Sequence, residues 1–296
     1  MKPIKHLKVK KGMKVADLVK EMGEIGFGAR KIAEASAILK EMIEDKECKI
    51  FLGVAGAMVP GGMKEVILDL LDYTGVFVTT GANLTHDLME SIGEKHYIGE
   101  ENVDDKKLHD EGIDRIYNVY LKNTVYEKLE KFFEDNWNEI SKAKTIKELL
   151  WKLGELCPSQ GILKKCWDKK IPIFCPALAD SGIGLMIWGR KAKGKNIVVD
   201  AFEDMKEIID FAWTSKKNGV IYVGGGVPKN FIQQSLQFSK GASYGIQIST
   251  DRPEPGGSSG ASLKEGISWG KMQAKGRFVD VFCDATIALP LILSTI

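Results

Sequence analysis

The stretch Gly219-Val-Ile-Tyr-Val-Gly-Gly-Gly226 joins a short apolar run to three successive glycines. An apolar run of this length is typical of a strand buried on both faces of a parallel sheet. Glycine in the following turn lets the backbone approach a ligand or the next helix closely. The stretch therefore predicts a buried strand that ends in a tight turn.

Similar apolar runs recur on both sides of this strand, and segments with helical spacing separate several of them. The expected strands cover residues 49–54, 75–81, 171–176, 196–200, 244–250 and 278–284. The expected helices cover residues 13–22, 29–44, 63–73 and 83–92. This alternation predicts an α/β fold with a helical N-terminal segment and a mostly parallel sheet covered by helices on both faces.

Two further segments do not fit this alternation of expected strands and helices. Residues 95–146 are dense in charged and aromatic side chains, and we expect an inserted segment of helices and loops. Residues 285–293 form the most apolar stretch of the chain, but they include a proline and are too short to span a membrane. We expect them to pack on the core.

Composition limits the class of protein. The chain has 42 basic and 40 acidic residues, a balance that argues against a dedicated nucleic-acid binder. No segment has the length and apolarity of a membrane span. Its five cysteines include no CxxC pair and its four histidines show no metal-ligand spacing, so we expect reduced thiols, no metal site and a cytoplasmic location.

Polar or small residues follow four of the expected strands, namely Thr80-Gly81, Gly225, Thr250 and Asp284-Ala285. In parallel sheets ligands bind beyond the carboxyl ends of the strands, so these residues are candidate ligand contacts. Each turn taken alone is weak evidence for a ligand contact, because tight strand-to-helix turns need glycine anyway, but four such turns on one sheet strengthen it. No GxGxxG fingerprint is present, and an ordinary Rossmann dehydrogenase is therefore not indicated.

Residues 252–271 form the most unusual stretch, a loop of Gly, Ser and Pro that leads into a short expected helix. Glu265 and Trp269 are four residues apart and share a face if the helix persists. A lysine such as Lys271 attacks a carbonyl or imine carbon when its environment favours the neutral amine. The alternative is an ordinary solvated surface lysine.

Two more residues have competing interpretations. Asp180 follows the expected strand 171–176 and is either a ligand-contacting carboxylate or a helix N-cap. His86 lies in the helix after Thr80 and is either a base or a capping or surface residue.

The segment Ile267-Ser-Trp-Gly-Lys271 resembles the hallmark of the deoxyhypusine synthase family, in which the lysine is the covalent nucleophile. Further segments resemble family segments in the same order, from about residue 25 to the C-terminus: 51–53, 78–80, 112–116, 176–178, 224–227, 259–261 and 284–285. The resemblance implies a basic N-terminal arm and helix over residues 1–24 and one Rossmann-like, NAD-binding catalytic domain over residues 25–296.

The resemblance also implies a chemistry. NAD accepts a hydride from a polyamine such as spermidine, and the lysine then takes up the aminobutyl group as an imine. The group passes to an acceptor amine, in the family a lysine of translation initiation factor 5A, and the stored hydride is returned. A homotetramer with active sites at subunit interfaces is implied as well.

Carried over residue by residue, the NAD-contacting positions are Thr80, Gly81, Asp180, Gly225, Thr250, Asp284 and Ala285. On the substrate side Lys271, Trp269 and Glu265 are kept, and Asn230 stands where the family has a histidine. The family's paired glutamates after the Thr-Thr turn are Thr85 and His86 here, and further carboxylates are replaced by Leu185, Pro255 and Ser258. Because a buried polycation needs paired carboxylates, we expect a remodelled substrate pocket. In this respect the chain resembles the deoxyhypusine synthase-like branch of the family rather than the enzyme that modifies the translation factor.

Three alternatives stay open on the sequence. Transfer to a small amine, as in homospermidine synthase, uses the same chemistry. A non-catalytic NAD-binding subunit would not need Lys271. A plain NAD dehydrogenase would release NADH instead of returning the hydride.

Overall fold

A computed structural model describes all residues 1–296, which form two compact units. The first unit contains Met1–Ala55, Asp72–Val78 and Met205–Ile296, and the second contains Gly56–Leu71 and Thr79–Asp204. The division into an arm over residues 1–24 and one domain over residues 25–296 stays a prediction.

The first unit holds most of the parallel sheet and the N- and C-terminal helices. Its elements are α1 (Val15–Met22), α2 (Phe27–Glu44), β1 (Cys48–Val54), nearly all of β2 (Val76–Thr79), most of α11 (Ala201–Thr214), β7 (Lys217–Val223), α12 (Gly226–Gln237), β8 (Ala242–Ser249), the short 3-10 helix η1 (Leu263–Ile267), β9 (Met272–Phe282) and α13 (Ala285–Leu293).

The strands of this unit lie in the order β2, β1, β7, β8, β9. The pairs β1–β7, β7–β8 and β8–β9 are all parallel. Every residue of β7 after Lys217 is buried, as the apolar run in the sequence predicts. The mostly parallel sheet and the N-terminal helices α1 and α2 are thus confirmed.

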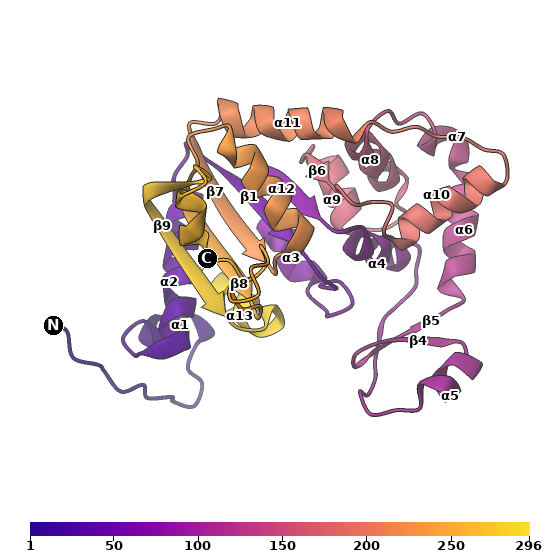
Figure 1. Cartoon of the computed structure of the whole chain (residues 1–296). Helices are drawn as coiled ribbons and strands as arrows, with labels where there is room; N and C mark the ends of the chain where they lie inside the picture. Colours follow the sequence, from indigo (N-terminus) through magenta and orange to yellow (C-terminus); the bar gives the residue numbers. More distant parts are fainter. The chain divides into compact units, whose positions relative to one another are not determined.

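Helices cover both faces of this sheet (Figure 1). A Cβ atom at Gly219 would meet Met42 of α2, whereas one at Gly53 would meet Ile232 of α12. Gly53 is paired with Tyr222 of β7, so these two residues lie on the same face of the sheet. Tyr222 is three residues from Gly219 on the same strand, and residues an odd number apart on a strand point to opposite faces. The two helices therefore lie on opposite faces, and α13 packs with α2.

The second unit is mainly helical. Its elements are α3 (Lys64–Leu71), α4 (Gly81–Ser91), β3 (Tyr97–Ile98), α5 (Asp105–Asp110), β4 (Ile113–Ile116), β5 (Val119–Lys122), α6 (Val125–Asp135), α7 (Trp137–Ile140), α8 (Ile146–Leu156), α9 (Ile162–Asp168), β6 (Ile173–Phe174) and α10 (Gly182–Ala192).

Two sequence-based expectations are wrong in this unit. The insertion over residues 95–146 is not only helix and loop, because β3, β5 and β4 form a small antiparallel sheet. The strand expected over residues 196–200 is absent, since only Asp200 forms a single bridge, to Thr145. An apolar run forms a β-strand only where a neighbouring strand can hydrogen-bond with its backbone N–H and C=O groups.

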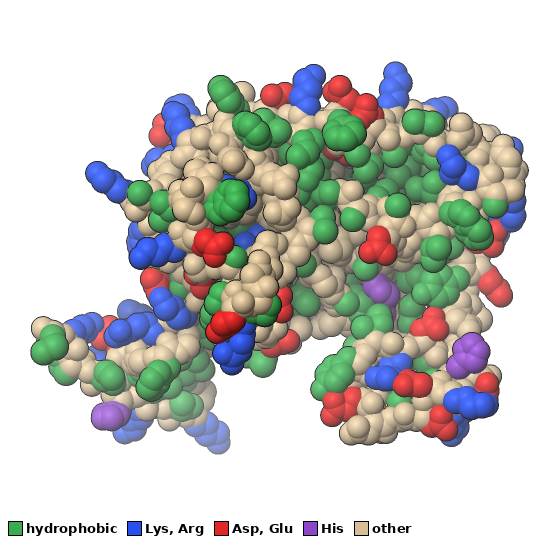
Figure 2. All heavy atoms as spheres, viewed as in Figure 1, with side chains coloured by type: hydrophobic (Ala, Val, Ile, Leu, Met, Phe, Trp, Pro, Cys, Tyr) green, Lys and Arg blue, Asp and Glu red, His purple; other side chains and the backbone are tan.

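Charged side chains of both signs are interspersed on the face shown in Figure 2. This pattern matches the near balance of 42 basic and 40 acidic residues. All five cysteines are free thiols. None of the helices combines the length with the apolar character that crossing a bilayer requires.

Candidate active site

A pocket of about 610 Å³ in the first unit gathers the substrate-side residues of that unit. Asn230 from α12, Glu265 from η1, and Trp269 and Lys271 from the turn before β9 all line it. These four residues are separated by up to 41 positions in the sequence. The fold therefore places the predicted nucleophile, aromatic ring and carboxylate around one cavity.

The short helix η1 and the turn after it set the position of Lys271. The Ser262 side chain caps η1 by accepting from the Glu265 N–H at 3.3 Å. Gly270 then adopts a φ of 72°, a left-handed conformation that favours glycine. The Lys271 N–H turns back to donate to the Gly266 carbonyl at 2.9 Å. The short helix ends at Ile267 and does not persist to Trp269, so the condition for a shared helix face of Glu265 and Trp269 is not met.

Lys271 and Trp269 contact each other directly. The Nζ atom of Lys271 lies 4.9 Å from the centroid of the Trp269 ring, within cation–π range. Trp269 is 58% exposed and thus has ring surface left for a ligand. The same ring can hold an alkylammonium group of a substrate.

Lys229 is a pocket residue that the sequence reasoning missed. It lines the pocket next to Asn230, yet its side chain is only 4% exposed. Its Nζ donates to the carbonyls of Ser258 at 2.5 Å and Ala261 at 2.6 Å. Lys229 therefore holds the Gly/Ser loop against α12. The only sequence signal was its place directly after the glycine turn and Pro228.

Burial lowers the pKa of Lys229 to about 8, because desolvation disfavours the charged ammonium. The carboxylates of Asp280 and Glu265 oppose this effect, and the charge of Lys271 adds to it. Burial in turn raises the pKa of Asp280, whose carboxylate accepts from the Leu263 N–H at 3.1 Å. The lining of the pocket thus contains two lysines, Lys229 and Lys271, and a single carboxylate, that of Glu265.

The predicted cofactor residues of the first unit lie at the ends of three adjacent strands. Gly225 follows β7, Thr250 follows β8, and Asp284 with Ala285 follows β9. Thr250 and Asp284 are exposed, and Asp284 caps α13 by accepting from the Thr286 N–H at 2.8 Å. An exposed carboxylate can accept hydrogen bonds from the ribose hydroxyls of a dinucleotide, and an exposed hydroxyl can donate to a phosphate oxygen. These residues therefore fit NAD.

Gly225 also has a packing role. A Cβ atom there would lie 2.3 Å from the Cα of Ser259, and the Ser259 hydroxyl accepts from the Gly226 N–H at 2.7 Å. The glycine turn is thus occupied by the Gly/Ser loop. Its glycine is required by the chain itself, whatever ligand binds nearby.

The remaining predicted residues belong to the second unit. Thr80 caps α4 by accepting from the Asn83 N–H at 3.2 Å. Gly81 packs so closely on Ser181 that an added Cβ would lie 2.5 Å from the Ser181 Cβ. Asp180 is exposed and is not the N-cap of α10, because Ser181 takes that role. The N-cap interpretation of Asp180 is therefore wrong.

His86 is half-buried in α4 and is neither a cap nor a fully exposed residue. Its Nδ1 lies 2.9 Å from Nε2 of His96, a partner that the sequence reasoning missed. Thr85 beside it is buried, donates to the Gly81 carbonyl and accepts from the Ile183 N–H. Thr85 thus holds α4 in place.

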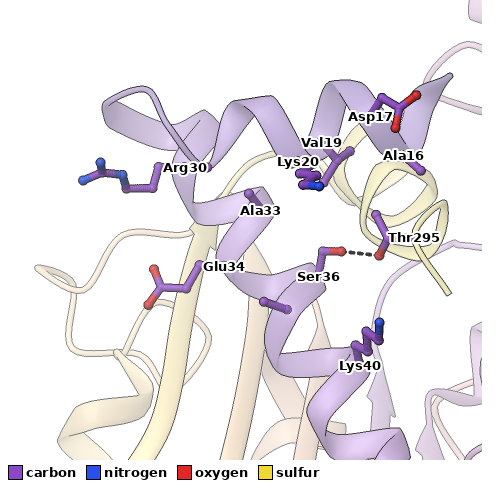
Figure 3. A pocket seen from close by; sticks show the side chains of 12 residues that line it. Ala16, Asp17, Val19, Lys20, Arg30, Ala33, Glu34, Ser36, Lys40 and Thr295 are labelled. Carbon is purple, nitrogen blue, oxygen red and sulfur yellow. Dashed lines mark hydrogen bonds between the residues drawn. The ribbon is translucent and has the colours of Figure 1, made fainter. Parts of the chain in front are cut away.

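A second pocket of about 680 Å³ lies between α1, α2 and the C-terminal residues (Figure 3). Basic and acidic side chains alternate around it, and Ser36 hydrogen-bonds to Thr295 there. It contains none of the predicted site residues. The pocket around Lys271 is therefore the candidate active site.

Comparisons with known proteins show which proteins this chain resembles. A deoxyhypusine synthase family model matches residues 17–296. The protein named probable deoxyhypusine synthase 1 of Methanosarcina mazei is 42% identical over 299 residues, covering 99% of this chain and 94% of that protein. The protein of the same name from Archaeoglobus fulgidus is 40% identical over 287 residues, covering 96% and 94%.

Among solved structures, one from Entamoeba histolytica that carries the deoxyhypusine synthase name shares the fold with a TM-score of 0.66. It is 22% identical and covers 99% of this chain and 96% of that chain. The named relatives indicate an alkylamine-transferring enzyme. The family match over nearly the whole length, together with the relatives near 40% identity, shows that this chain belongs to the deoxyhypusine synthase family.

Proposed function

We propose that this protein transfers the aminobutyl group of a polyamine such as spermidine to an acceptor amine through an imine on Lys271. The observation that carries this proposal is the pocket itself, in which Lys271 Nζ lies 4.9 Å from the Trp269 ring and beside Glu265 and Asn230. A nucleophile, a cation-binding ring and a carboxylate around one cavity suit a cationic amine substrate.

The pocket residues have separate tasks. Trp269 and Glu265 hold an alkylammonium group by cation–π and ion-pair attraction. Lys271 uses its Nζ lone pair to attack the carbon of a substrate imine, and the displaced amine leaves with the electron pair of the broken C–N bond and a proton from the lysine. The acceptor amine then displaces Lys271 by the same exchange. Lys229 ties the Gly/Ser loop, part of which lines the pocket, to α12.

Gly225, Thr250, Asp284 and Ala285, at the strand ends of the first unit, would hold NAD. Thr80, Gly81 and Asp180 of the second unit stay predicted contacts of NAD. When bound, it supplies the acceptance and return of one hydride. A cytoplasmic homotetramer and a lysine of translation initiation factor 5A as acceptor complete the proposal.

The test is mass spectrometry of the intact protein with NAD and a panel of amines, trapped with borohydride. We expect a spermidine-derived aminobutyl adduct that peptide mapping places on Lys271. The matched controls are Lys271→Arg, which should lose the adduct, and Lys275→Arg, an exposed lysine four residues along β9 that should keep it. Mapping also separates Lys271 from Lys229, the other lysine of the pocket.

The alternatives have their own outcomes. Product formed with a small amine but not with the translation factor would favour a homospermidine synthase type of transfer. Accumulation of free NADH would indicate a plain dehydrogenase. NAD binding without any adduct would refute the Lys271 imine and favour a non-catalytic subunit.

A further inference from the structure

Amide side chains form one wall of the pocket around Lys271. They come from a single helix, α12, at positions three, four or seven residues apart, and such positions share one face of a helix. The lining residues of this amide strip are Asn230, Gln233, Gln234 and Gln237. Gln233 donates to the Tyr222 hydroxyl at 3.2 Å, whereas the other three side chains make no hydrogen bond within the protein. The strip therefore has amide groups that are free to bind a ligand.

Carboxylates are scarce in the same pocket. Glu265 is the single carboxylate of the lining, which also contains the two basic residues Lys229 and Lys271. Asp280 lies close enough to act on the charge of Lys229, but it is not part of the lining, and its carboxylate accepts from the Leu263 N–H at 3.1 Å. A ligand that enters the pocket thus finds one acidic group in the lining.

This charge balance limits the number of ammonium groups that the pocket can hold. One ammonium can pair with Glu265 and lie against the exposed ring of Trp269. A second ammonium would lack a carboxylate, and a buried charge without a partner is costly. An amide oxygen accepts a hydrogen bond from an ammonium but does not neutralise its charge. A substrate with an ammonium at each end therefore fits this pocket poorly.

The rest of the lining suits an uncharged polar end. The free amides of α12 can both donate to and accept from an amide group of a ligand. Met205 of α11 and the exposed Phe238 after α12 add apolar surface, which a short acyl group would cover. An acyl amide at one end of a polyamine combines these properties and removes one positive charge.

We propose that the pocket selects an amine with one charged end and one uncharged, hydrogen-bonding end, such as a polyamine acylated on one terminal nitrogen, and that Gln234 determines this specificity. The proposal deepens, and rests on, the amine substrate of the proposed function. The transfer step stays as described there. The C–N bond at the inner nitrogen breaks, and the amide bond of the acyl group is untouched.

The direct test is calorimetric titration of the natural protein with spermidine, N1-acetylspermidine and N8-acetylspermidine. NADH is present, because it cannot accept a hydride and the amine then binds without reacting. We expect at least one acetylated isomer to bind with a Kd about tenfold lower than that of spermidine, since it buries one unpaired charge fewer. The proposal is overturned if neither isomer binds more tightly than spermidine.

A second test places a carboxylate in the amide strip. Gln234 is half-buried, and Gln234→Glu keeps the size of the side chain while adding a negative charge. The Kd of spermidine should fall about tenfold, and the Kd of the preferred acetylated isomer should change less. Asn138→Asp, the same exchange at an exposed position of α7, should leave both values unchanged. A folded Gln234→Glu variant that keeps the natural ratio of the two Kd values would contradict the role of Gln234.

The two proposals fail in different ways. Tighter binding of an acetylated isomer without any Lys271 adduct in the borohydride experiment would remove the transferase but keep this specificity. A Lys271 adduct formed from spermidine, with spermidine the tightest ligand of the three, would keep the transferase and remove the specificity.

Discussion

The buried ammonium of Lys229 makes the stability of the protein depend on pH in a way that one substitution removes. Its pKa falls from the ordinary lysine value of 10.5 to about 8 on folding, because the side chain is only 4% exposed. Between these two values the unfolded chain binds the proton and the folded protein does not. Stability from this group is therefore full above pH 10.5 and is lost as the pH falls through 8.

The size of the effect follows from the same two values. At about 1.4 kcal/mol per pH unit, a drop from 10.5 to about 8 corresponds to about 3 kcal/mol. Lys229→Met keeps the length of the side chain but cannot titrate. The unfolding free energy of the natural protein should thus rise by about 3 kcal/mol relative to Lys229→Met between pH 8 and 10.5.

The assay is urea unfolding of both proteins at fixed protein concentration across this pH range, with the slope m checked for constancy. Lys264→Met, a change of an exposed lysine on η1, is the matched control and should follow the natural protein. Parallel curves for the natural protein and Lys229→Met would show that Lys229 keeps its ordinary proton affinity. In that case the burial argument is refuted.

Three further outcomes follow from the packing. Asp87→Ala should destabilise the protein by about 3 kcal/mol in urea unfolding, because two N–H groups at the start of α9 lose their acceptor; an unchanged midpoint would contradict this. Gly225→Ala should cost about 2 kcal/mol, since its Cβ would lie 2.3 Å from Ser259, whereas Gly189→Ala meets nothing within 4 Å and should not destabilise thermal unfolding. Among the five thiols, Cys283 should react first with a thiol reagent in the native protein, because burial raises the pKa of the other four; early labelling of Cys166 would disprove it.

The sheet could be predicted because its strands are buried on both faces. β1 and β7 consist largely of apolar residues, so a local run is enough to identify them. The run at 196–200 has the same composition, but it has no neighbouring strand. The small strands β3, β4 and β5 have few fully buried residues. They therefore contain no long apolar run by which the sequence could identify them as strands. An apolar composition indicates that a segment is buried, whereas a β-strand also needs a neighbouring strand with which its backbone can hydrogen-bond.

The candidate site divides in the same way. Lys271 and Trp269 were found because they lie in one local motif, two residues apart. Lys229 and the His86–His96 pair were missed, since their partners lie 10 to 32 residues away and no periodicity connects them. Hydrogen bonds between residues far apart in the sequence form only in the folded protein, and no local sequence pattern predicts them.

The two glycines predicted as NAD contacts show how one signal can have two causes. In the sequence, glycine predicts close backbone approach to a ligand, yet Gly81 and Gly225 both approach the protein's own chain, at Ser181 and Ser259. A glycine indicates that another group lies close to the backbone, but it does not identify whether that group is a ligand or the protein itself. Binding of NAD at these turns must therefore be judged on the exposed side chains beside them. The assignment of chemistry depends instead on Lys271, whose contact with the Trp269 ring in a pocket has no comparable structural requirement.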